Sequence, residues 1–265
     1  MLLKSTYFPK HYENFMKNEG DIDAAREYFL KNRPSNLEFL LQKRYSWMNN
    51  YINEDSKVVE LGSGAGFAKE FIKSDNLLLT DINKREWIDM KVDAMAPPFE
   101  DESLDVVICS HMIHHIAKPV VFFNNISKKI KHNGYLLIQD INTSLLMRFL
   151  LKLMRHEGWS YDVDVFDKNQ VTNNPNDPWS ANCAIPELLF RNADKFETEI
   201  PSFKVILNQL NEGFVFPLSG GVISKTRIIQ LPYMLMKFVG LIDSSLISVF
   251  PNIFALGRSV VLQKI

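Results

Sequence analysis

Three glycines at alternate positions follow a β-branched run in the stretch VVELGSGAGFAKEF, residues 58–71. A glycine-rich turn between a strand and a helix lets a nucleotide approach the backbone closely, because glycine has no Cβ and readily adopts positive φ. We therefore predict a cofactor site that contains Glu60, Gly62, Ser63, Gly64 and Gly66. The alternative is a tight strand-to-helix turn that binds no ligand.

The residue types around this turn narrow the choice of nucleotide. A dinucleotide fold needs the pattern G-x-G-x-x-G, and Phe67 stands where its third glycine belongs. Glu60 could instead accept a cationic amino group, directly or through water. Asp81 ends the next apolar run, and its carboxylate can accept hydrogen bonds from both ribose hydroxyls. Ile82, the next residue, is also predicted to belong to the cofactor site. We expect loss of Asp81 to weaken cofactor binding with little effect on stability.

The pattern E-x-G-x-G-x-G resembles motif I of the class I methyltransferases that use S-adenosylmethionine (SAM). The segment VDAMAPPFEDESLDVVICSHMIHHI, residues 92–116, is similar to the type 11 methyltransferase pattern, in which D-A-x-x-L-P-F precedes the fourth strand and H-H-L follows it. The resemblance covers about residues 56–142. It implies SAM as the cofactor, with Asp93 on the adenine amino group and with Ala94 and Met95 flanking the adenine. The alternative for Asp93 is a turn carboxylate that binds its own backbone.

Methyl transfer from a sulfonium is an in-line displacement, and a hydroxyl acceptor also needs to lose its proton. Open α/β sheets bind ligands beyond the carboxyl ends of their strands, so Ser110 and His111 are expected closest to the reacting methyl group. The predicted catalytic residues are His111, His156 and Asp140. For His114 and His115 we favour helix packing. No metal site is predicted, because the histidines and carboxylates lack a recognisable ligand spacing.

The elements that must position these residues alternate between strand and helix. Apolar strands are expected at 57–62, 76–82, 87–94, 104–110 and 134–141, and later at 203–210 and 252–265. Helices are expected at 21–32, capped by Asp21, at 35–52, opened by a capping box of Ser35 and Glu38, and at 117–134, ended by Asn133-Gly134. Together with the resemblance, this predicts an α/β, Rossmann-like class I methyltransferase fold, with a mostly parallel seven-stranded sheet and helices on both faces.

The predicted organisation is a single methyltransferase domain over 1–265. It consists of a helical cap (1–53), a SAM-binding core (54–145), an acceptor-side insertion (146–202) and late strands (203–265), with an apolar helical insertion at 211–252. Burial in the core is expected for the apolar stretch 232–251; the alternatives are that it closes over the acceptor, with 211–252 helping to roof the acceptor pocket, or that it contacts a membrane. Asp81 and Asp93 lie too close in sequence for the usual helix between the second and third strands, so that helix is expected to be missing or a single turn.

Composition excludes several classes of partner. Thirty basic and 31 acidic residues give a formal net charge of −1, which offers no electrostatic footprint for nucleic acid. Two cysteines provide no metal spacing, and the start of the chain lacks a signal peptide, so a cytoplasmic location is expected. The apolar stretch 228–256 leaves peripheral membrane contact open. Oligomeric state is left open.

The favoured function is a SAM-dependent methyltransferase that O-methylates a small-molecule, glycan or lipid-linked acceptor. Two alternatives stand beside it: a nicotinamide-dependent oxidoreductase, and a non-catalytic SAM-binding partner subunit. Phe67 counts against the first alternative, while only an intact acceptor pocket would separate the second from an enzyme.

Overall fold

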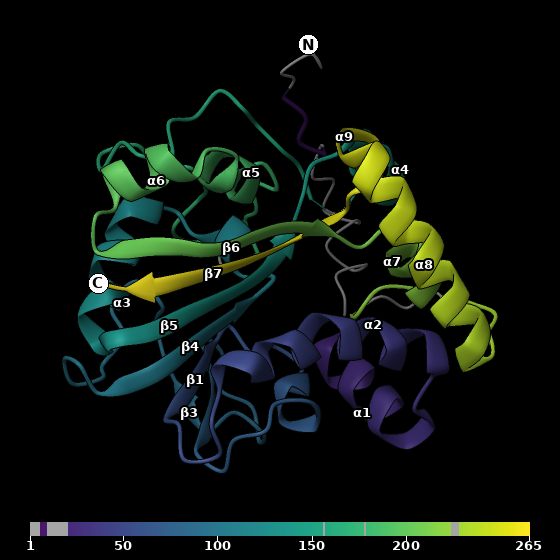
Figure 1. The fold of residues 1–265 in the computed structure, drawn as a ribbon, viewed down its shortest axis with the longest axis horizontal. Helices are drawn as coiled ribbons and strands as arrows, with labels where there is room; N and C mark the ends of the chain where they lie inside the picture. The colour runs from purple at the N-terminus through teal and green to yellow at the C-terminus, as the bar shows by residue number, and fades with distance from the viewer. Residues whose placement is uncertain (1–5, 10–20, 156, 178, 224–227) are drawn as a thin grey trace.

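The computed structural model describes residues 6–9, 21–155, 157–177, 179–223 and 228–265. Its centre is a seven-stranded sheet in the order β3-β2-β1-β4-β5-β7-β6 (Figure 1). The first five strands pair in parallel, and β7 runs antiparallel to both β5 and β6. The predicted mostly parallel sheet is therefore confirmed. The strands are β1 (Val58–Leu61), β2 (Leu77–Asp81), β3 (Met90–Lys91), β4 (Leu104–Ser110), β5 (Ile130–Ile141), β6 (Phe203–Asn211) and β7 (Gly257–Lys264).

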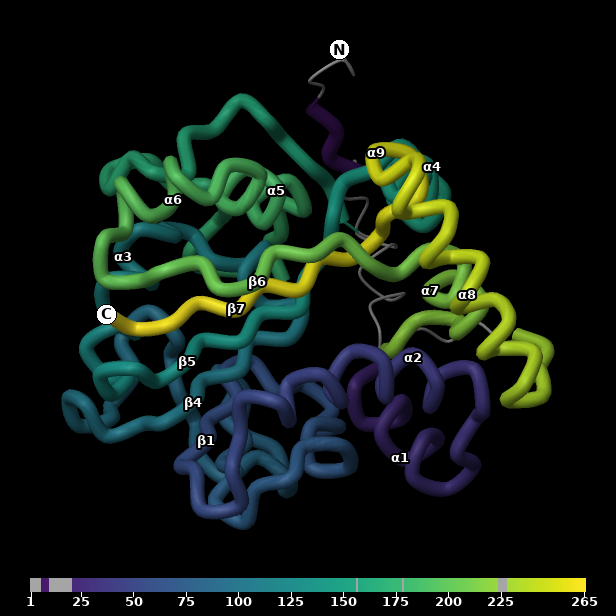
Figure 2. The backbone as a smooth tube through the Cα atoms, viewed as in Figure 1, coloured from purple at the N-terminus to yellow at the C-terminus, as the bar shows by residue number. Residues whose placement is uncertain are grey.

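Helices cover both faces of this sheet. The helices are α1 (Ile22–Asn32), α2 (Ser35–Tyr45), α3 (Pro119–Lys129), α4 (Leu145–Met154), α5 (Ile185–Phe190), α6 (Ala193–Glu199), α7 (Val215–Ser219), α8 (Tyr233–Val249) and α9 (Pro251–Phe254). Short 3₁₀ turns add η2 (Ser46–Tyr51), η3 (Phe67–Glu70) and η4 (Ile113–His115). The segment between α4 and α5 leads the chain from the α8 side of the molecule back to the α5 side (Figure 2).

The apolar strand runs are buried on both sides because alternate residues feed two separate cores. Val107 and Ile138 pack with α3, α5 and α6, whereas the neighbouring Ile108 and Leu137 pack with α1 and α2. This is the arrangement expected of parallel strands that are covered on both faces. Cys109 is fully buried, as expected for a small core residue.

The N-terminal helices form where the sequence predicts them, but only one begins as expected. Asp21 caps α1 by accepting a hydrogen bond from the Ala24 amide (3.0 Å). The capping box at Ser35 is wrong, because Pro34 occupies the N-cap and the Ser35 hydroxyl donates to the Leu231 carbonyl (2.8 Å). The predicted buried face of this region is confirmed by Leu37, Leu40, Leu41, Tyr45 and Met48.

Several element boundaries differ from the predictions. The helix expected at 35–52 is α-helical only to Tyr45 and continues as η2, and the strand expected at 87–94 is reduced to Met90–Lys91. Helix α3 ends at Lys129, and β5 already begins at Ile130, so Asn133-Gly134 does not end the helix. A Cβ at Gly134 would lie 2.7 Å from the Asp105 carbonyl oxygen, so close packing against the neighbouring strand β4 accounts for this glycine. The last strand begins at Gly257, because Pro251–Phe254 form α9. The connection from β2 to β3, which is described throughout, contains no helix, as predicted.

The apolar insertion is not buried to the extent expected. Helix α8 buries Met236, Gly240, Asp243 and Ile247, but it leaves Phe238 58% and Leu241 67% exposed. The buried Asp243 carboxylate accepts hydrogen bonds from the amides of residues 213–215, which holds α8 by its polar side. None of the helices in the described ranges is both long and apolar enough to cross a membrane.

Candidate active site

The glycine turn after β1 places all three glycines in the left-handed region, with φ of 71° at Gly62, 51° at Gly64 and 69° at Gly66. A Cβ at Gly62 would lie 2.7 Å from Met112 Cγ, and one at Gly66 would lie 2.7 Å from Trp87 Cδ1. At Gly64 a Cβ would meet nothing within 4 Å among the described residues. Packing therefore accounts for two of the glycines, whereas Gly64 faces open space.

Side chains from distant elements hold this turn in place. The Trp87 indole donates to the Gly64 carbonyl (2.9 Å), and Arg26 of α1 donates to the Ala65 carbonyl (2.6 Å). The buried Ser63 hydroxyl donates to the Glu60 carbonyl (3.2 Å) and so stabilises the turn from inside. Sequence reasoning identified Ser63 but gave no role to Trp87 or to Arg26.

Glu60 lies under the turn with 1% of its surface exposed. The Tyr45 hydroxyl donates to Oε1 (2.9 Å), while Oε2 is buried and has no hydrogen-bond partner in the described part of the chain. Burial raises the pKa of Glu60 to about 7, against the opposing effect of the Tyr45 hydrogen bond. An unpartnered carboxylate oxygen beside open backbone fits the ammonium group of an amino-acid-like ligand such as SAM.

Asp81 is built into the turn more firmly than the sequence suggested. Its Oδ2 accepts the Gly64 amide (2.9 Å), and its Oδ1 accepts the Asn83 amide (2.8 Å). These two contacts argue against the expectation that Asp81 contributes little to stability, because two backbone amides would lose their partner with it. Its remaining lone pairs are available to a ribose, and the adjacent Ile82 is 41% exposed.

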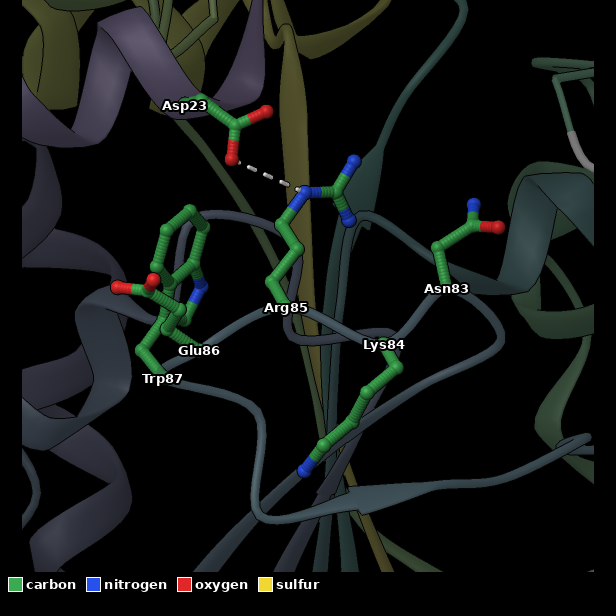
Figure 3. A pocket seen from close by; sticks show the side chains of 6 residues that line it. All are labelled: Asp23, Asn83, Lys84, Arg85, Glu86 and Trp87. Atoms are coloured by element: carbon green, nitrogen blue, oxygen red, sulfur yellow. Dashed lines mark ion pairs between the residues drawn. The ribbon is translucent and has the colours of Figure 1, made fainter.

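A polar recess of about 590 Å³ opens just beyond Asp81, lined by Asp23 and residues 83–87. Figure 3 shows Arg85 turned toward Asp23, with Nε–Oδ1 at 3.5 Å, while Lys84 points away from that pair. Trp87 lines this recess and also binds the Gly64 carbonyl. The recess therefore adjoins the predicted cofactor turn.

The predicted adenine site lies at the next strand end. Asp93 is exposed, and its Oδ1 accepts the Met95 amide (2.8 Å), which is the local turn contact considered as the alternative. Ala94 and Met95 are partly buried and pack against the core. The role of Asp93 toward adenine stays a prediction.

His111 follows β4 with φ of 54°, a left-handed conformation that is uncommon outside glycine. Its Nδ1 is buried and has no partner among the described residues, and its amide donates to the Gln139 carbonyl (2.7 Å). Burial, together with the charge of Arg44, lowers the pKa of His111 to about 3. His111 is therefore neutral near pH 7, and its Nδ1 is a weak base. Ser110, also predicted here, is the half-buried last residue of β4.

Asp140 is the second-last residue of β5, and its buried carboxylate binds His114. The buried Oδ1 lies 2.5 Å from His114 Nδ1, and Oδ2 accepts the Ile113 amide (2.8 Å). Burial alone would lower the pKa of His114, but the Asp140 carboxylate raises it well above its ordinary value. Sequence reasoning favoured helix packing for His114. It is buried, but the structure also places it in an ion pair.

Glu157 joins these histidines from the segment after α4. Its Oε1 lies 3.8 Å from His114 Nε2 and 3.9 Å from His115 Nε2. The His115 Nδ1 lies 3.1 Å from the Ser180 carbonyl oxygen. Sequence reasoning missed this cluster, because Glu157 is far from the histidines along the chain. The predicted catalytic residue His156 lies outside the described residues.

A buried ion pair closes this end of the sheet. Arg44 of α2 donates from Nε and Nη2 to the two carboxylate oxygens of Glu212, at 2.8 and 2.7 Å, and both side chains are under 5% exposed. The side-chain amide of Gln139 also donates from Nε2 to Glu212 Oε1 (2.9 Å). The pair fixes α2 to the chain just after β6, beside His111. No sequence pattern pointed to it.

The strand order, the antiparallel β7 and the acidic residues at successive strand ends define a class I methyltransferase architecture. The chain matches the family described as "Methyltransferase domain" over residues 24–185. That match spans more than half of the chain, so the chain belongs to this methyltransferase family. The predictions of this fold class and of SAM as the cofactor are confirmed.

The chain is also similar to individual known proteins. An uncharacterized methyltransferase of Schizosaccharomyces pombe is 34% identical over 105 residues, 34% of this chain and 41% of that protein. The ubiquinone biosynthesis O-methyltransferase of Rickettsia akari is 23% identical over 150 residues, 51% of this chain and 58% of that protein. The matches thus cover less than two thirds of either relative. A SAM-dependent methyltransferase structure from Archaeoglobus fulgidus is 18% identical, covers 95% of this chain and 98% of its own, and has a TM-score of 0.48.

Proposed function

We propose that this chain is a SAM-dependent methyltransferase that transfers the methyl group to a hydroxyl oxygen. The observation that carries the proposal is the buried Oε2 of Glu60, which has no hydrogen-bond partner among the described residues and precedes a glycine turn with open space at Gly64. An ammonium group there would satisfy a buried carboxylate oxygen that otherwise has no partner. Asp81 would bind the ribose, and Asp93 the adenine, at the ends of the next two strands.

Oxygen as the acceptor atom is supported by His111. Its buried Nδ1 can accept a hydrogen bond from a hydroxyl group brought to the end of β4. The similar Rickettsia akari protein is named an O-methyltransferase, which agrees with this choice. Because His111 is a weak base, we infer that it orients the hydroxyl and that proton loss is completed with further help. In this role His156 remains a second candidate.

The acceptor is proposed to be a glycan, glycolipid or secondary metabolite with an apolar part. Support comes from an outer apolar surface on α4, α8 and α9, which lie on the same side of the molecule, away from α5 and α6 (Figure 1). The most exposed apolar side chains of this surface are Phe149, Leu153, Met154, Met234, Phe238, Leu241, Val249 and Phe250. Eight large apolar side chains that are each at least half exposed suggest contact with a partner or a lipid.

The charges of this surface favour an anionic lipid. Helix α4 carries Arg148 and Lys152 and no acidic residue, and α8 carries Lys237, while its one acid, Asp243, is 1% exposed. Peripheral contact of residues 228–256 with a membrane would present a lipid-linked acceptor to the site. We infer that the described parts of 211–252, residues 211–223 and 228–252, roof the acceptor pocket, because Glu212 at their start pairs with Arg44 beside His111.

Calorimetric titration with SAM, S-adenosylhomocysteine and NAD tests the cofactor part of the proposal. We expect binding of the first two compounds and none of NAD. Binding of NAD alone would support the nicotinamide-dependent oxidoreductase instead. Incubation with methyl-labelled SAM and panels of glycan, glycolipid and phenolic acceptors then tests the reaction. SAM binding without transfer to any panel would support a non-catalytic partner subunit.

A further inference from the structure

The two neighbouring histidines of η4 and Glu157 form a cluster that the proposed function does not use. His114 Nε2, His115 Nε2 and a carboxylate oxygen of Glu157 all lie within 4.8 Å of one another. The distances of 3.8 and 3.9 Å from Glu157 Oε1 to the two nitrogens are too long for hydrogen bonds. Three ligand atoms around a tetrahedral Zn²⁺ would lie about 3.4 Å apart, so a small contraction would bring these three atoms to a common ion.

The partners of the two imidazoles determine which nitrogen of each ring faces the cluster. The Ser180 carbonyl can only accept, so His115 donates to it from Nδ1 (3.1 Å) and, when neutral, carries its lone pair on Nε2. The Asp140 carboxylate holds His114 Nδ1 (2.5 Å), and because this carboxylate also favours the protonated ring, a metal ion would have to displace the proton from His114 Nε2. Both Nε2 atoms are thereby turned toward Glu157 as metal ligands would be.

Each member of the cluster also has the outer partner that metal ligands usually have. A carboxylate supports His114 and a backbone carbonyl supports His115. The buried Cys183 thiol donates to Glu157 Oε2 (3.3 Å), the oxygen that does not face the histidines. Such outer contacts fix ring orientation and raise ligand basicity.

We propose that His114, His115 and Glu157 bind a divalent transition-metal ion of the Zn²⁺ type. Two imidazole nitrogens and one carboxylate oxygen suit such an ion, and three protein ligands leave a position open for an exchangeable oxygen. Sequence spacing gave no metal prediction, because Glu157 enters the site from the far end of α4.

The open position could hold the acceptor hydroxyl, and this role rests on the proposed function. Met112 lies against Gly62 of the cofactor turn and is two residues before His114, so the ion and the cofactor would share one edge of the sheet. A metal-bound hydroxyl would lose its proton to solvent more easily. Its oxygen would then form the new bond to the SAM methyl carbon while the carbon–sulfur bond breaks, and the electron pair would stay on the sulfur of S-adenosylhomocysteine.

The test measures metal binding alone, with no methyl acceptor, so it is independent of the proposed reaction. The metal-free protein is titrated with Zn²⁺ by calorimetry and with Co²⁺ by visible absorption. We expect one ion per chain and the absorption bands of a four- or five-coordinate Co²⁺ site. A folded wild-type protein that binds neither ion would overturn the proposal without any variant.

Variants then locate the ion. His115→Ala and Glu157→Gln should weaken Zn²⁺ binding by more than the roughly 10- to 100-fold that loss of an outer partner costs. His132→Ala, at an exposed histidine, is the matched control and should bind as wild type does. Circular dichroism checks that each variant is folded. Wild-type affinity in folded His115→Ala and Glu157→Gln would place the ion elsewhere and refute the assignment.

Discussion

Replacing Glu60 by Gln should change how the stability of the cofactor-free protein depends on pH. Glu60 is 1% exposed, and burial raises its pKa from the ordinary value of 4.5 to about 7. The folded state therefore keeps a proton that the unfolded state loses as the pH rises above 4.5. It follows that the free energy of unfolding falls as the pH rises from 4.5 through 7, and that the loss is complete above 7.

The size of this effect follows from the pKa shift. The shift corresponds to about 3 kcal/mol in total, of which about 2 to 3 kcal/mol falls between pH 5 and pH 8. The Glu60→Gln variant cannot ionise, and its amide oxygen can still accept the Tyr45 hydrogen bond. Between pH 5 and pH 8, we expect the free energy of unfolding of wild type to fall by about 2 to 3 kcal/mol more than that of the Glu60→Gln variant.

Urea unfolding of both proteins at pH 5 and pH 8, without cofactor, measures the difference. Glu54→Gln, at an exposed loop position, is the control and should follow wild type. An identical pH dependence in wild type and Glu60→Gln would refute the reasoning from burial. Because a bound ammonium group favours the ionised carboxylate, S-adenosylhomocysteine should also release a proton when it binds at pH 6. Calorimetry in two buffers of different ionisation enthalpy detects that release.

Four further outcomes are expected. Gly64→Val should abolish SAM binding. The Gly64→Ala variant has a similar backbone strain of about 1–2 kcal/mol but a smaller side chain, so it should bind SAM more tightly than the Gly64→Val variant. Normal calorimetric binding by the Gly64→Val variant would mean that the turn is purely structural. Asp81→Ala should weaken SAM binding roughly ten- to hundred-fold. Because two amide contacts are lost, it should also lower the free energy of unfolding by about 1–3 kcal/mol, measured by urea unfolding. Unchanged SAM affinity in the folded variant would refute the ribose assignment. His111→Ala should lower kcat roughly 10²-fold, the loss expected when the acceptor hydroxyl is no longer oriented, with SAM affinity near wild type, and full turnover would move its role elsewhere. Phe238→Glu should reduce sedimentation with phosphatidylglycerol vesicles but not S-adenosylhomocysteine affinity, and equal sedimentation would argue against membrane contact.

Local sequence pattern was enough to predict the strand and the glycines that form the cofactor turn. The strand from Val58 and the glycines that follow it are specified by residues close together in the chain, because apolar runs and positive φ are local properties. Asp81 and Asp93 were predicted at strand ends for the same reason. Boundaries were predicted less accurately. Helix α3 already ends at Lys129, and Gly134 lies within β5, where it closely approaches the Asp105 carbonyl of the neighbouring strand β4.

Contacts between distant segments were beyond the reach of the sequence. The pairing of Arg44 with Glu212, and the approach of Glu157 to His114, each depend on how elements far apart in the chain pack around the sheet. A charged side chain in the sequence gives no sign of the partner that will make its burial tolerable.

Helix α8 shows the same limit for apolar residues. Its sequence specifies a helix with apolar residues around most of its circumference, and this alone predicted burial. The tertiary structure turned Asp243 inward, where three backbone amides satisfy it, and left Phe238 on the surface. The sequence by itself determined the strands, the glycine turn and the cofactor class, because these depend on neighbouring residues. Only the tertiary structure decided which charges meet and which apolar face stays exposed, because those depend on the space that the other elements leave.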